Sequence, residues 1–370
     1  MSVLLKKPLF EGVSQKELVE QLEGQKKSQG KLPTWFNTRG IYYPNKLNIE
    51  QTSSEPTAQY KANLVDGKTL LDLTGGFGVD SYFFSKKIDT VFHCEIDENL
   101  SEITSHNFTM LGRKNIECFA ENGIDFLKHT SEKLDWVYAD PSRRSDKKGK
   151  VFLLRDCLPD IPKNLNLIFE KTENVLLKTS PLLDIKQGVE ELEFVKEVHV
   201  VALQNEVKEL LFVLEKGFVG DIAIKTVNLK DTGEDTFNFM LSEEPNALVA
   251  FGEPANYLYE PNAAILKSGG FKSVGSQFQL NKLHQHSHLY TASKLIDFPG
   301  RPFEIVKALP YSKSSIKKLG TSKANITTRN FPVSVADLRK KHKISDGGEI
   351  YLFFTTDIHN NLLFLVCKKV

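Results

Sequence analysis

The stretch that decides the fold is Leu70-Leu71-Asp72-Leu73-Thr74-Gly75-Gly76-Phe77-Gly78-Val79-Asp80. Its apolar beginning predicts a β-strand that ends in an acid, passes through a glycine-rich turn and opens a helix. Chains use this arrangement to bring backbone amides against a nucleoside cofactor at the carboxyl end of a parallel strand. The same residues also fit plain strand-to-helix punctuation, so the prediction needs support from the rest of the chain.

The spacing of the glycines excludes two common kinds of nucleotide site. A dinucleotide fingerprint needs G-x-G-x-x-G, but Ser81 stands at the third glycine position. The chain also contains no G-x-x-x-x-G-K-[ST] sequence, which excludes a P-loop. What remains is Asp72, three residues, then Gly76-Phe77-Gly78, a pattern found in S-adenosylmethionine sites. In such a site Asp72 lies near the ammonium of the methionine moiety, and the glycines let the backbone approach the cofactor.

Polar side chains follow the next two strands as well. Glu95 ends the second predicted strand, where an acid accepts hydrogen bonds from ribose hydroxyls. Asn122 follows the third strand, where it can bond an adenine amino group while Gly123 leaves room for the ring. Suitable groups at three successive strand ends predict a cofactor site. Its expected members are Asp72, Thr74, Gly75, Gly76, Gly78, Glu95, Ile96, Asn122, Gly123 and Asp140.

The fourth predicted strand ends in Asp140-Pro141-Ser142-Arg143. There it would face a methyl donor at the topological switch point of the sheet. Methyl transfer from a sulfonium is an in-line displacement that needs an aligned lone pair more than an activated nucleophile. An acid and a proline-fixed carbonyl can accept a hydrogen from an amino or ring nitrogen and so aim its lone pair. We therefore expect Asp140, Pro141, Ser142 and Arg143 to be catalytic, although Asp-Pro also ends strands for structural reasons alone.

Strand-like and helix-like segments alternate from residue 69 to about residue 214, which predicts a parallel α/β sheet. The expected strands are 69–73, 90–96, 116–120, 136–139 and 174–178, with a hairpin of 195–203 and 210–214. The expected helices are 79–87, 98–111, 123–130 and 183–192, preceded by a polar surface helix at 15–29. Strands at 222–229 and 236–241 flank a polar turn, and the last seventy residues read as a small α+β domain.

The C-terminal third of the chain is strongly basic although the net charge is only +1. From residue 261 onward there are 17 Lys and Arg against 6 Asp and Glu. Such a surface neutralises phosphates, which favours a nucleic-acid partner over a solvated face that merely balances an acidic domain. A second basic run follows the Asp-Pro turn and is expected to bind substrate, with a plain charged loop as the alternative. Its members are Arg143, Arg144, Lys147 and Lys148.

Length and composition limit the class of protein. A chain of 370 residues has room for two or three domains. No apolar run reaches the roughly 18 residues of a membrane span, and no secretory signal is recognisable, so a membrane partner is not expected. The four cysteines are scattered, as in a protein of the reducing cytoplasm. No metal is expected either, because His284, His286 and His288 have no carboxylate or cysteine pattern beside them.

Several of these motifs resemble those of class I S-adenosylmethionine-dependent methyltransferases. The likeness rests on residues 70–80, Cys94-Glu95-Ile96-Asp97, His106-Asn107 and Asp140-Pro141-Ser142-Arg143-Arg144. More narrowly, residues 50–61 and 140–144 resemble bacterial members with a THUMP-like C-terminal domain, and residues 257–265 and 301–303 are similar to later regions of that family. The chain departs from the Asp/Asn-Pro-Pro-aromatic motif of many amino-directed members at Ser142 and Arg143. Arginine can stack on a base or bind phosphate, so the departure is compatible with nucleic acid.

The resemblance implies a Rossmann-like, seven-stranded methyltransferase sheet within an α/β fold. It also implies a ferredoxin-like segment and a THUMP-like domain after the sheet. We therefore expect an N-terminal helical lid segment at 1–62, the methyltransferase domain at 63–250, the ferredoxin-like segment at 251–296 and the basic THUMP-like domain at 297–370. True THUMP domains accompany enzymes that modify RNA. The implied function is therefore S-adenosylmethionine-dependent methylation of tRNA or rRNA at a nucleotide nitrogen. A methyltransferase for a small molecule or protein, and a non-catalytic RNA-binding module, remain as alternatives, and the sequence indicates no oligomeric state.

Overall fold

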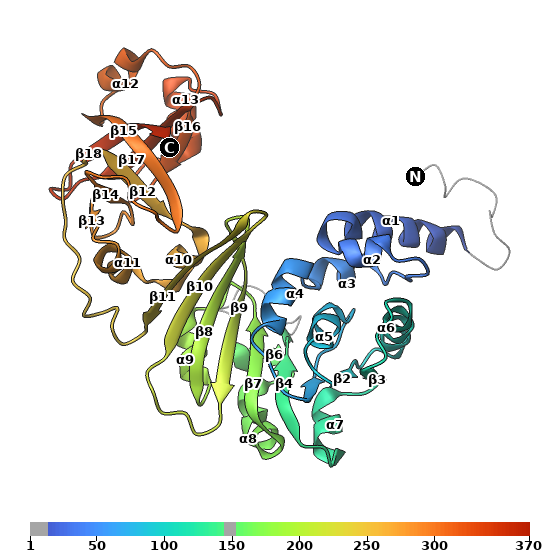
Figure 1. The fold of residues 1–370 in the computed structure, drawn as a ribbon. Helices are drawn as coiled ribbons and strands as arrows, with labels where there is room; N and C mark the ends of the chain where they lie inside the picture. Colours follow the sequence, from blue (N-terminus) through green and yellow to red (C-terminus); the bar gives the residue numbers. More distant parts are fainter. Residues whose placement is uncertain (1–13, 144–152) are drawn as a thin grey trace. The chain divides into compact units, whose positions relative to one another are not determined.

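The computed structural model describes residues 14–143 and 153–370. The expected substrate-binding residues Arg144, Lys147 and Lys148 lie outside the described residues. The chain divides into two compact units (Figure 1). The first consists of Met1–Val198 and Glu209–Gly220, and the second of His199–Lys208 and Asp221–Val370.

Four helices, drawn in blue in Figure 1, open the described part of the first unit. They are α1 (Gln15–Lys31), α2 (Pro33–Asn37), α3 (Lys46–Gln51) and α4 (Glu55–Ala62). Ser14 caps α1 by accepting a hydrogen bond from the backbone N–H of Glu17 at 3.1 Å, and prolines occupy the first turns of α2 and α4. The fully buried ring of Trp35 lies edge-on to Tyr82, with 4.9 Å between the ring centroids. The polar helix expected at 15–29 is confirmed.

The core of the first unit is a parallel sheet with the strand order β7-β4-β1-β2-β3. Its strands are β1 (Thr69–Asp72), β2 (Thr90–Cys94), β3 (Ile116–Phe119), β4 (Leu134–Ala139) and β7 (Thr172–Thr179). The central strands are short runs of buried, mostly apolar residues, as expected for a sheet covered on both faces. The α/β fold predicted from the alternating pattern is confirmed.

The sheet continues with antiparallel strands beyond β7. β9 (Glu206–Glu215) pairs antiparallel with β7, and β8 (Val195–Leu203) precedes it in a hairpin. Gln204 and Asn205 both have positive φ angles, as a two-residue hairpin turn requires. A further antiparallel hairpin, β10 (Ala223–Lys230) and β11 (Gly233–Met240), completes the order β11-β10-β8-β9-β7-β4-β1-β2-β3. The sheet therefore has nine strands rather than the expected seven, because the β10–β11 hairpin joins its edge.

Helices connect the strands of the first unit. They are α5 (Val79–Phe84), α6 (Glu98–Met110), α7 (Gly123–His129), α8 (Ile161–Lys171) and α9 (Ile185–Glu191). Helix α8 was not among the helices expected from the sequence, although Asp160 caps it and Pro162 stands in its first turn. Its buried residues recur with helical spacing at Ile161, Leu165, Ile168 and Phe169. This short apolar stripe is followed directly by strand β7, which is also apolar, so the two elements were not distinguished in the sequence.

The second unit is built on a seven-stranded sheet with the order β13-β14-β12-β15-β18-β17-β16. Its strands are β12 (Tyr257–Pro261), β13 (Asn281–Lys282), β14 (Tyr290–Ala292), β15 (Gly300–Pro310), β16 (Asn325–Thr328), β17 (Ile350–Thr356) and β18 (Leu362–Lys369). Its helices are α10 (Ala263–Ser268), α11 (Phe271–Gln277), α12 (Lys313–Leu319) and α13 (Val335–His342). Neighbouring residues of β17 fall into different core clusters, Phe353 with Leu258 and Phe354 with Ile316. Because side chains alternate along a strand, the sheet is buried on both faces.

None of the helices within residues 14–143 and 153–370 combines the length and the apolar character that crossing a bilayer requires.

Candidate active site

The glycine-rich turn after β1 holds the acid that ends β2. The backbone N–H of Gly76 donates to Glu95 Oε2 at 2.9 Å, and the N–H of Asp97 donates to Glu95 Oε1 at 2.8 Å. Both oxygens of the carboxylate are thus fixed by backbone amides, while part of the side chain stays accessible. The structure brings Gly76 and Glu95 together, as the sequence predicts from neighbouring parallel strands.

The glycines of the turn serve different purposes. A Cβ on Gly76, whose φ is +57°, would make only an ordinary contact, at 3.7 Å from the carbonyl oxygen of Thr74, so there is room for it. A Cβ on Gly78 would lie 2.4 Å from Phe108 Cζ, and one on Gly75 would lie 2.2 Å from His93 Cε1. Gly123 is similarly tight, because its Cβ would lie 2.5 Å from the carbonyl oxygen of Leu73. Of these glycines, Gly76 alone could carry a Cβ without a clash.

Asp72, expected beside the cofactor, is a buried anchor of the turn. Only 1% of the residue is exposed, and its carboxylate accepts hydrogen bonds from the Thr74 N–H at 3.0 Å and the Ser81 hydroxyl at 2.6 Å. Burial raises the pKa of Asp72 to about 7. The Thr74 hydroxyl oxygen accepts a hydrogen bond of 2.7 Å from the backbone N–H of Asp140. Thr74 thus joins the end of β1 to the end of β4.

His93 lies behind the turn and was missed in the sequence analysis. Its ring is fully buried, and Nδ1 lies 3.0 Å from the hydroxyl of Ser81. Burial lowers the pKa of His93 to about 3, so the imidazole is neutral. The signal available in the sequence was a histidine within the apolar strand Thr90–Cys94. That signal could not predict the contact with Ser81, which lies in helix α5 after the turn.

The ends of β2 and β3 contribute two further predicted residues. Ile96 follows Glu95 and is 73% exposed. Asn122 is exposed and caps α7, accepting a hydrogen bond from the Ile124 N–H at 2.9 Å. The cap occupies the side-chain oxygen and leaves the amide nitrogen without a partner among the described residues.

Asp140 at the end of β4 forms an ion pair with Lys178 at the end of β7. The two strands pair in parallel with Ala139 opposite Leu177, which sets the next residue of each strand side by side. Pro141 is buried and Ser142 is exposed. Ser142–Arg143 forms the short strand β5, which pairs with β6 (Cys157–Leu158). Lys178 was not among the predicted site residues.

A buried charge network lies behind this ion pair. Lys61 of α4 is fully buried, and its ammonium lies 2.7 Å from Glu209 Oε1 and 3.2 Å from Asp80 Oδ1. The second oxygen of Asp80 accepts from the Tyr138 hydroxyl at 2.7 Å and from Ser53 at 2.9 Å.

Burial would by itself raise the pKa of Asp80, but the ammonium groups of Lys61 and Lys178 hold it below its usual value. Burial outweighs the same ammonium groups at Glu209 and raises the pKa of that carboxyl. Burial would lower the pKa of Lys178, but the carboxylates of Asp140, Glu209 and Asp80 raise it above its ordinary value. Lys178 is therefore a cation at neutral pH.

His284, His286 and His288 of the second unit make hydrogen bonds and a ring contact with neighbouring residues. His284 Nδ1 accepts from the His286 N–H at 3.1 Å and lies 2.9 Å from Asn330 Nδ2, while Nε2 lies 3.1 Å from Asn360 Oδ1. His288 stacks on Phe271 with 3.6 Å between the ring centroids. Among the residues that the structure describes, no group of three or more His, Cys, Asp or Glu side chains is placed to hold a metal ion.

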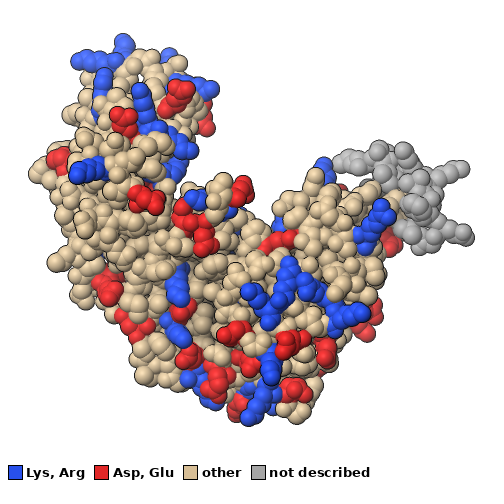
Figure 2. Space-filling view, viewed as in Figure 1, with Lys and Arg blue, Asp and Glu red and all other residues tan. Residues whose placement is uncertain are grey.

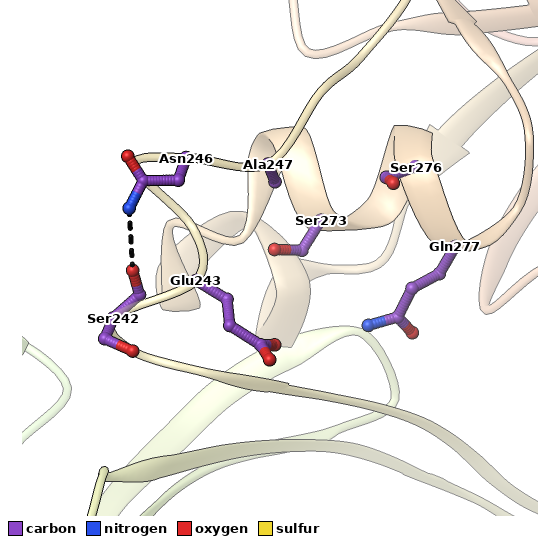
Figure 3. A pocket seen from close by; sticks show the side chains of 7 residues that line it. All are labelled: Ser242, Glu243, Asn246, Ala247, Ser273, Ser276 and Gln277. Atoms are coloured by element: carbon purple, nitrogen blue, oxygen red, sulfur yellow. Dashed lines mark hydrogen bonds between the residues drawn. The ribbon is translucent and has the colours of Figure 1, made fainter.

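Two pockets also lie in the second unit. The pocket in Figure 3 has a volume of about 470 Å³ and lies between the segment after β11 and helix α11. Its lining residues are Ser242, Glu243, Asn246, Ala247, Ser273, Ser276 and Gln277. A second pocket of about 720 Å³ borders His284 and His286. Neither pocket contains any of the predicted catalytic or cofactor-binding residues.

Comparison with known proteins places the chain in a family. A family model for a ferredoxin-like domain matches residues 257–299, and one for a THUMP domain-like region matches residues 300–369. The solved structure of a candidate methyltransferase from Porphyromonas gingivalis W83 is 30% identical, with a TM-score of 0.92 over 100% of this chain and 94% of that one. The chain belongs to the bacterial class I methyltransferase family with a THUMP-like C-terminal domain.

Two weaker likenesses each cover less than half of this chain. An rRNA methylase from Streptococcus thermophilus is 17% identical with a TM-score of 0.32, covering 44% of this chain and 95% of that one. TrmK of M. capricolum, solved with S-adenosylhomocysteine, is 14% identical with a TM-score of 0.36, covering 45% of this chain and 70% of that one. No curated protein matches the chain. The family resemblance noted in the sequence, including its THUMP-like domain, is thus confirmed.

Proposed function

We propose that this chain transfers a methyl group from S-adenosylmethionine to a nitrogen of an RNA nucleotide. The observation that carries the proposal is the hydrogen bond from the Asp140 N–H to Thr74 Oγ1. It joins the glycine turn to the Asp-Pro turn across two adjacent strands. Because an in-line displacement needs donor and acceptor in a fixed relative position, this link supports a transferase.

The residues around the turn fit S-adenosylmethionine. Gly76 has room beside its backbone, since a Cβ there would meet only the Thr74 carbonyl oxygen at 3.7 Å, and this room suits the close approach of a ligand. Glu95 retains lone pairs for the ribose hydroxyls, and the exposed side chain of Ile96 offers an apolar surface to the adenine ring. Asn122 and Gly123 complete the adenine end, while Asp72 and Gly78 act by holding the turn. Bound there, S-adenosylmethionine supplies a methyl group on a positively charged sulfur.

The basic residues of the THUMP-like domain support an RNA substrate. Lys and Arg side chains gather on the face of this domain that Figure 2 shows. Several lie at the carboxyl ends of α12 and α13, where cations are favoured by the helix dipole. The exposed lysines of these two helices and their caps are Lys313, Lys317, Lys318, Lys340, Lys341 and Lys343. A phosphate backbone would neutralise such a group.

The proposal is tested by cofactor binding and by transfer. Isothermal titration with S-adenosylmethionine is expected to show one site in the wild type and binding at least about tenfold weaker in Glu95→Gln, since a charge-assisted hydrogen bond is worth about 1.5–3 kcal/mol. Tritiated S-adenosylmethionine and total RNA from a deletion strain are expected to give labelled nucleosides, and Asp140→Ala is expected to abolish the label. Cofactor binding without label in RNA, but with label in protein or small molecules, would contradict the RNA substrate.

A further inference from the structure

The ion pair of Asp140 and Lys178, at the ends of β4 and β7, retains hydrogen-bond donors and an acceptor that no described residue uses. Within residues 14–143 and 153–370, the Lys178 ammonium makes one hydrogen bond, to Asp140 Oδ2, and Asp140 Oδ1 accepts none. An ammonium carries three N–H donors, so two remain. The Asp140 side chain is 34% exposed and that of Lys178 is 13% exposed. An acceptor and a cationic donor therefore stand side by side at the edge where the substrate nitrogen is expected.

We propose that Asp140 and Lys178 together select a nucleobase edge in which a ring N–H adjoins a carbonyl, the lactam edge of guanine or uracil. The inference rests on the proposed function and names the substrate class of that same site. Asp140 Oδ1 accepts the hydrogen of the ring nitrogen, and Lys178 donates to the neighbouring carbonyl oxygen.

The alternative edges are disfavoured by the charge of Lys178. Adenine and cytosine also offer an N–H beside an acceptor, but there the acceptor is a ring nitrogen conjugated with the amine. A cation on that ring nitrogen withdraws electron density from the amine and weakens its lone pair. On a lactam, by contrast, loss of the ring proton builds negative charge on the carbonyl oxygen, and a preorganised cation stabilises it.

The reaction that follows is balanced within the site. The ring N–H bond breaks and its proton passes to Asp140 Oδ1, leaving the electron pair on the nitrogen and charge on the carbonyl oxygen beside Lys178. That electron pair forms the N–CH₃ bond as the C–S bond of the sulfonium donor breaks and its electrons remain on sulfur. The products are a neutral N-methylated lactam, a neutral thioether and protonated Asp140, which releases the proton to water.

The buried network explains why Lys178 is available for this role. Glu209 and Asp80 add to the negative potential that keeps Lys178 charged. They are themselves paired with Lys61, at 2.7 and 3.2 Å. Lys178 is a specificity-determining residue in this proposal, and the network is its support.

The identity of the product tests the inference without any variant. Purified full-length protein is incubated with S-adenosylmethionine and total RNA from a deletion strain, and the digested nucleosides are identified by mass spectrometry. We expect 1-methylguanosine or 3-methyluridine, and the two differ in mass, which separates the two lactam bases. Any other methylated nucleoside overturns the lactam edge but leaves the proposed function standing. Absence of every methylated nucleoside contradicts both.

Variants at Lys178 then separate a role in selection from a role in folding. Lys178→Met is expected to lower kcat about 100-fold, the scale for removing one donor to a developing oxyanion. Its KM for RNA and its dissociation constant for S-adenosylmethionine are expected to stay within about twofold, because neither depends on charge that appears only in the transition state. Lys178→Arg keeps the cation and is expected to recover much of the loss.

The matched control is Lys216→Met, which removes an exposed lysine paired with Glu173 of the same strand β7. We expect it to leave kcat unchanged. Thermal unfolding of each variant identifies any loss caused by misfolding. If Lys178→Met is folded and retains the wild-type kcat, the proposal is wrong.

Discussion

The ammonium of Lys61 lies 2.7 Å from Glu209 Oε1, and 148 residues separate the two along the chain. Their side chains are 0% and 3% exposed. The ammonium also approaches Asp80, so one cation offsets two buried carboxylates. The contact ties α4 to α5 and β9 within the first unit. It makes α4 part of the support beneath the Asp140–Lys178 pair.

Removing Lys61 is expected to destabilise the protein strongly. Lys61→Met leaves Glu209 and Asp80 buried without their main cation, which typically costs about 3–5 kcal/mol. The measurement is the free energy of unfolding from urea titration, followed by a signal of the first unit. Lys61→Met combined with Glu209→Gln is expected to regain part of the loss, because one unpaired charge is gone. A single variant within about 1 kcal/mol of wild type would contradict the buried network.

Alanine at two glycines of the turn should separate binding from folding. Gly76→Ala adds a methyl group that clashes with no protein atom but sits at positive φ, a strain of about 1–2 kcal/mol, and is expected to weaken S-adenosylmethionine binding at least about tenfold. Gly78→Ala adds a Cβ at 2.4 Å from Phe108 and is expected to lose clearly more folding stability. Calorimetric titration and urea unfolding measure the two effects. Equal binding by wild type and a folded Gly76→Ala would place the cofactor elsewhere.

Stability should depend on pH through His93. Its pKa is lowered by burial to about 3 in the folded state, against 6.5 ordinarily. Below the ordinary value the unfolded chain takes up a proton that the folded chain does not, so stability falls as the pH falls. Between about pH 7.5 and about pH 4.5, the titration of His93 should lower the free energy of unfolding by roughly 3 kcal/mol.

His93→Gln removes that dependence, so its stability relative to wild type should improve by roughly 3 kcal/mol at the lower pH. Urea unfolding of both proteins at the two pH values provides the measurement. The buried carboxyl of Asp72 is present in both proteins, so its own titration largely cancels in the comparison. A difference that is the same at both pH values would show that His93 is not held neutral.

Charge removal in the THUMP-like domain should weaken RNA binding and lower its salt dependence. Lys317 and Lys318 are exposed in the last turn of α12. Replacing both with Ala should lower the slope of log K against log salt by roughly 1.5–2, if each neutralises one phosphate. S-adenosylmethionine binding should not change. The slope is measured by filter binding at several salt concentrations. An unaltered slope would show that these lysines of α12 do not contact RNA.

Features carried by consecutive residues were predictable from the sequence. The strand ending in Asp72, the turn through Gly76 and Gly78, and the acid at Glu95 follow from period, propensity and the rule that parallel strands end at one edge. The roles within the turn were not predictable. Asp72 anchors the turn through Ser81, because the strand carries its carboxylate into the core rather than toward the open side.

Contacts between residues far apart along the chain could not be predicted from a single sequence. Nothing in the residues around Lys61 indicates Glu209, and nothing near Asp140 indicates Lys178. Each pair exists because strand order and register bring together positions that the chain keeps apart, and a register shifted by one residue would separate them.

The sequence by itself determined that this chain forms a parallel α/β sheet with a glycine turn and an Asp-Pro turn at its carboxyl edge, followed by a basic domain. Local propensity and short spacing suffice for that much. The tertiary structure decided which of these groups remain open to a ligand, which are used up inside the fold, and which partner stands beside Asp140. The physical reason is that burial and long-range pairing set the charge and the free hydrogen-bonding capacity of a side chain, and both depend on neighbours that the local sequence does not specify.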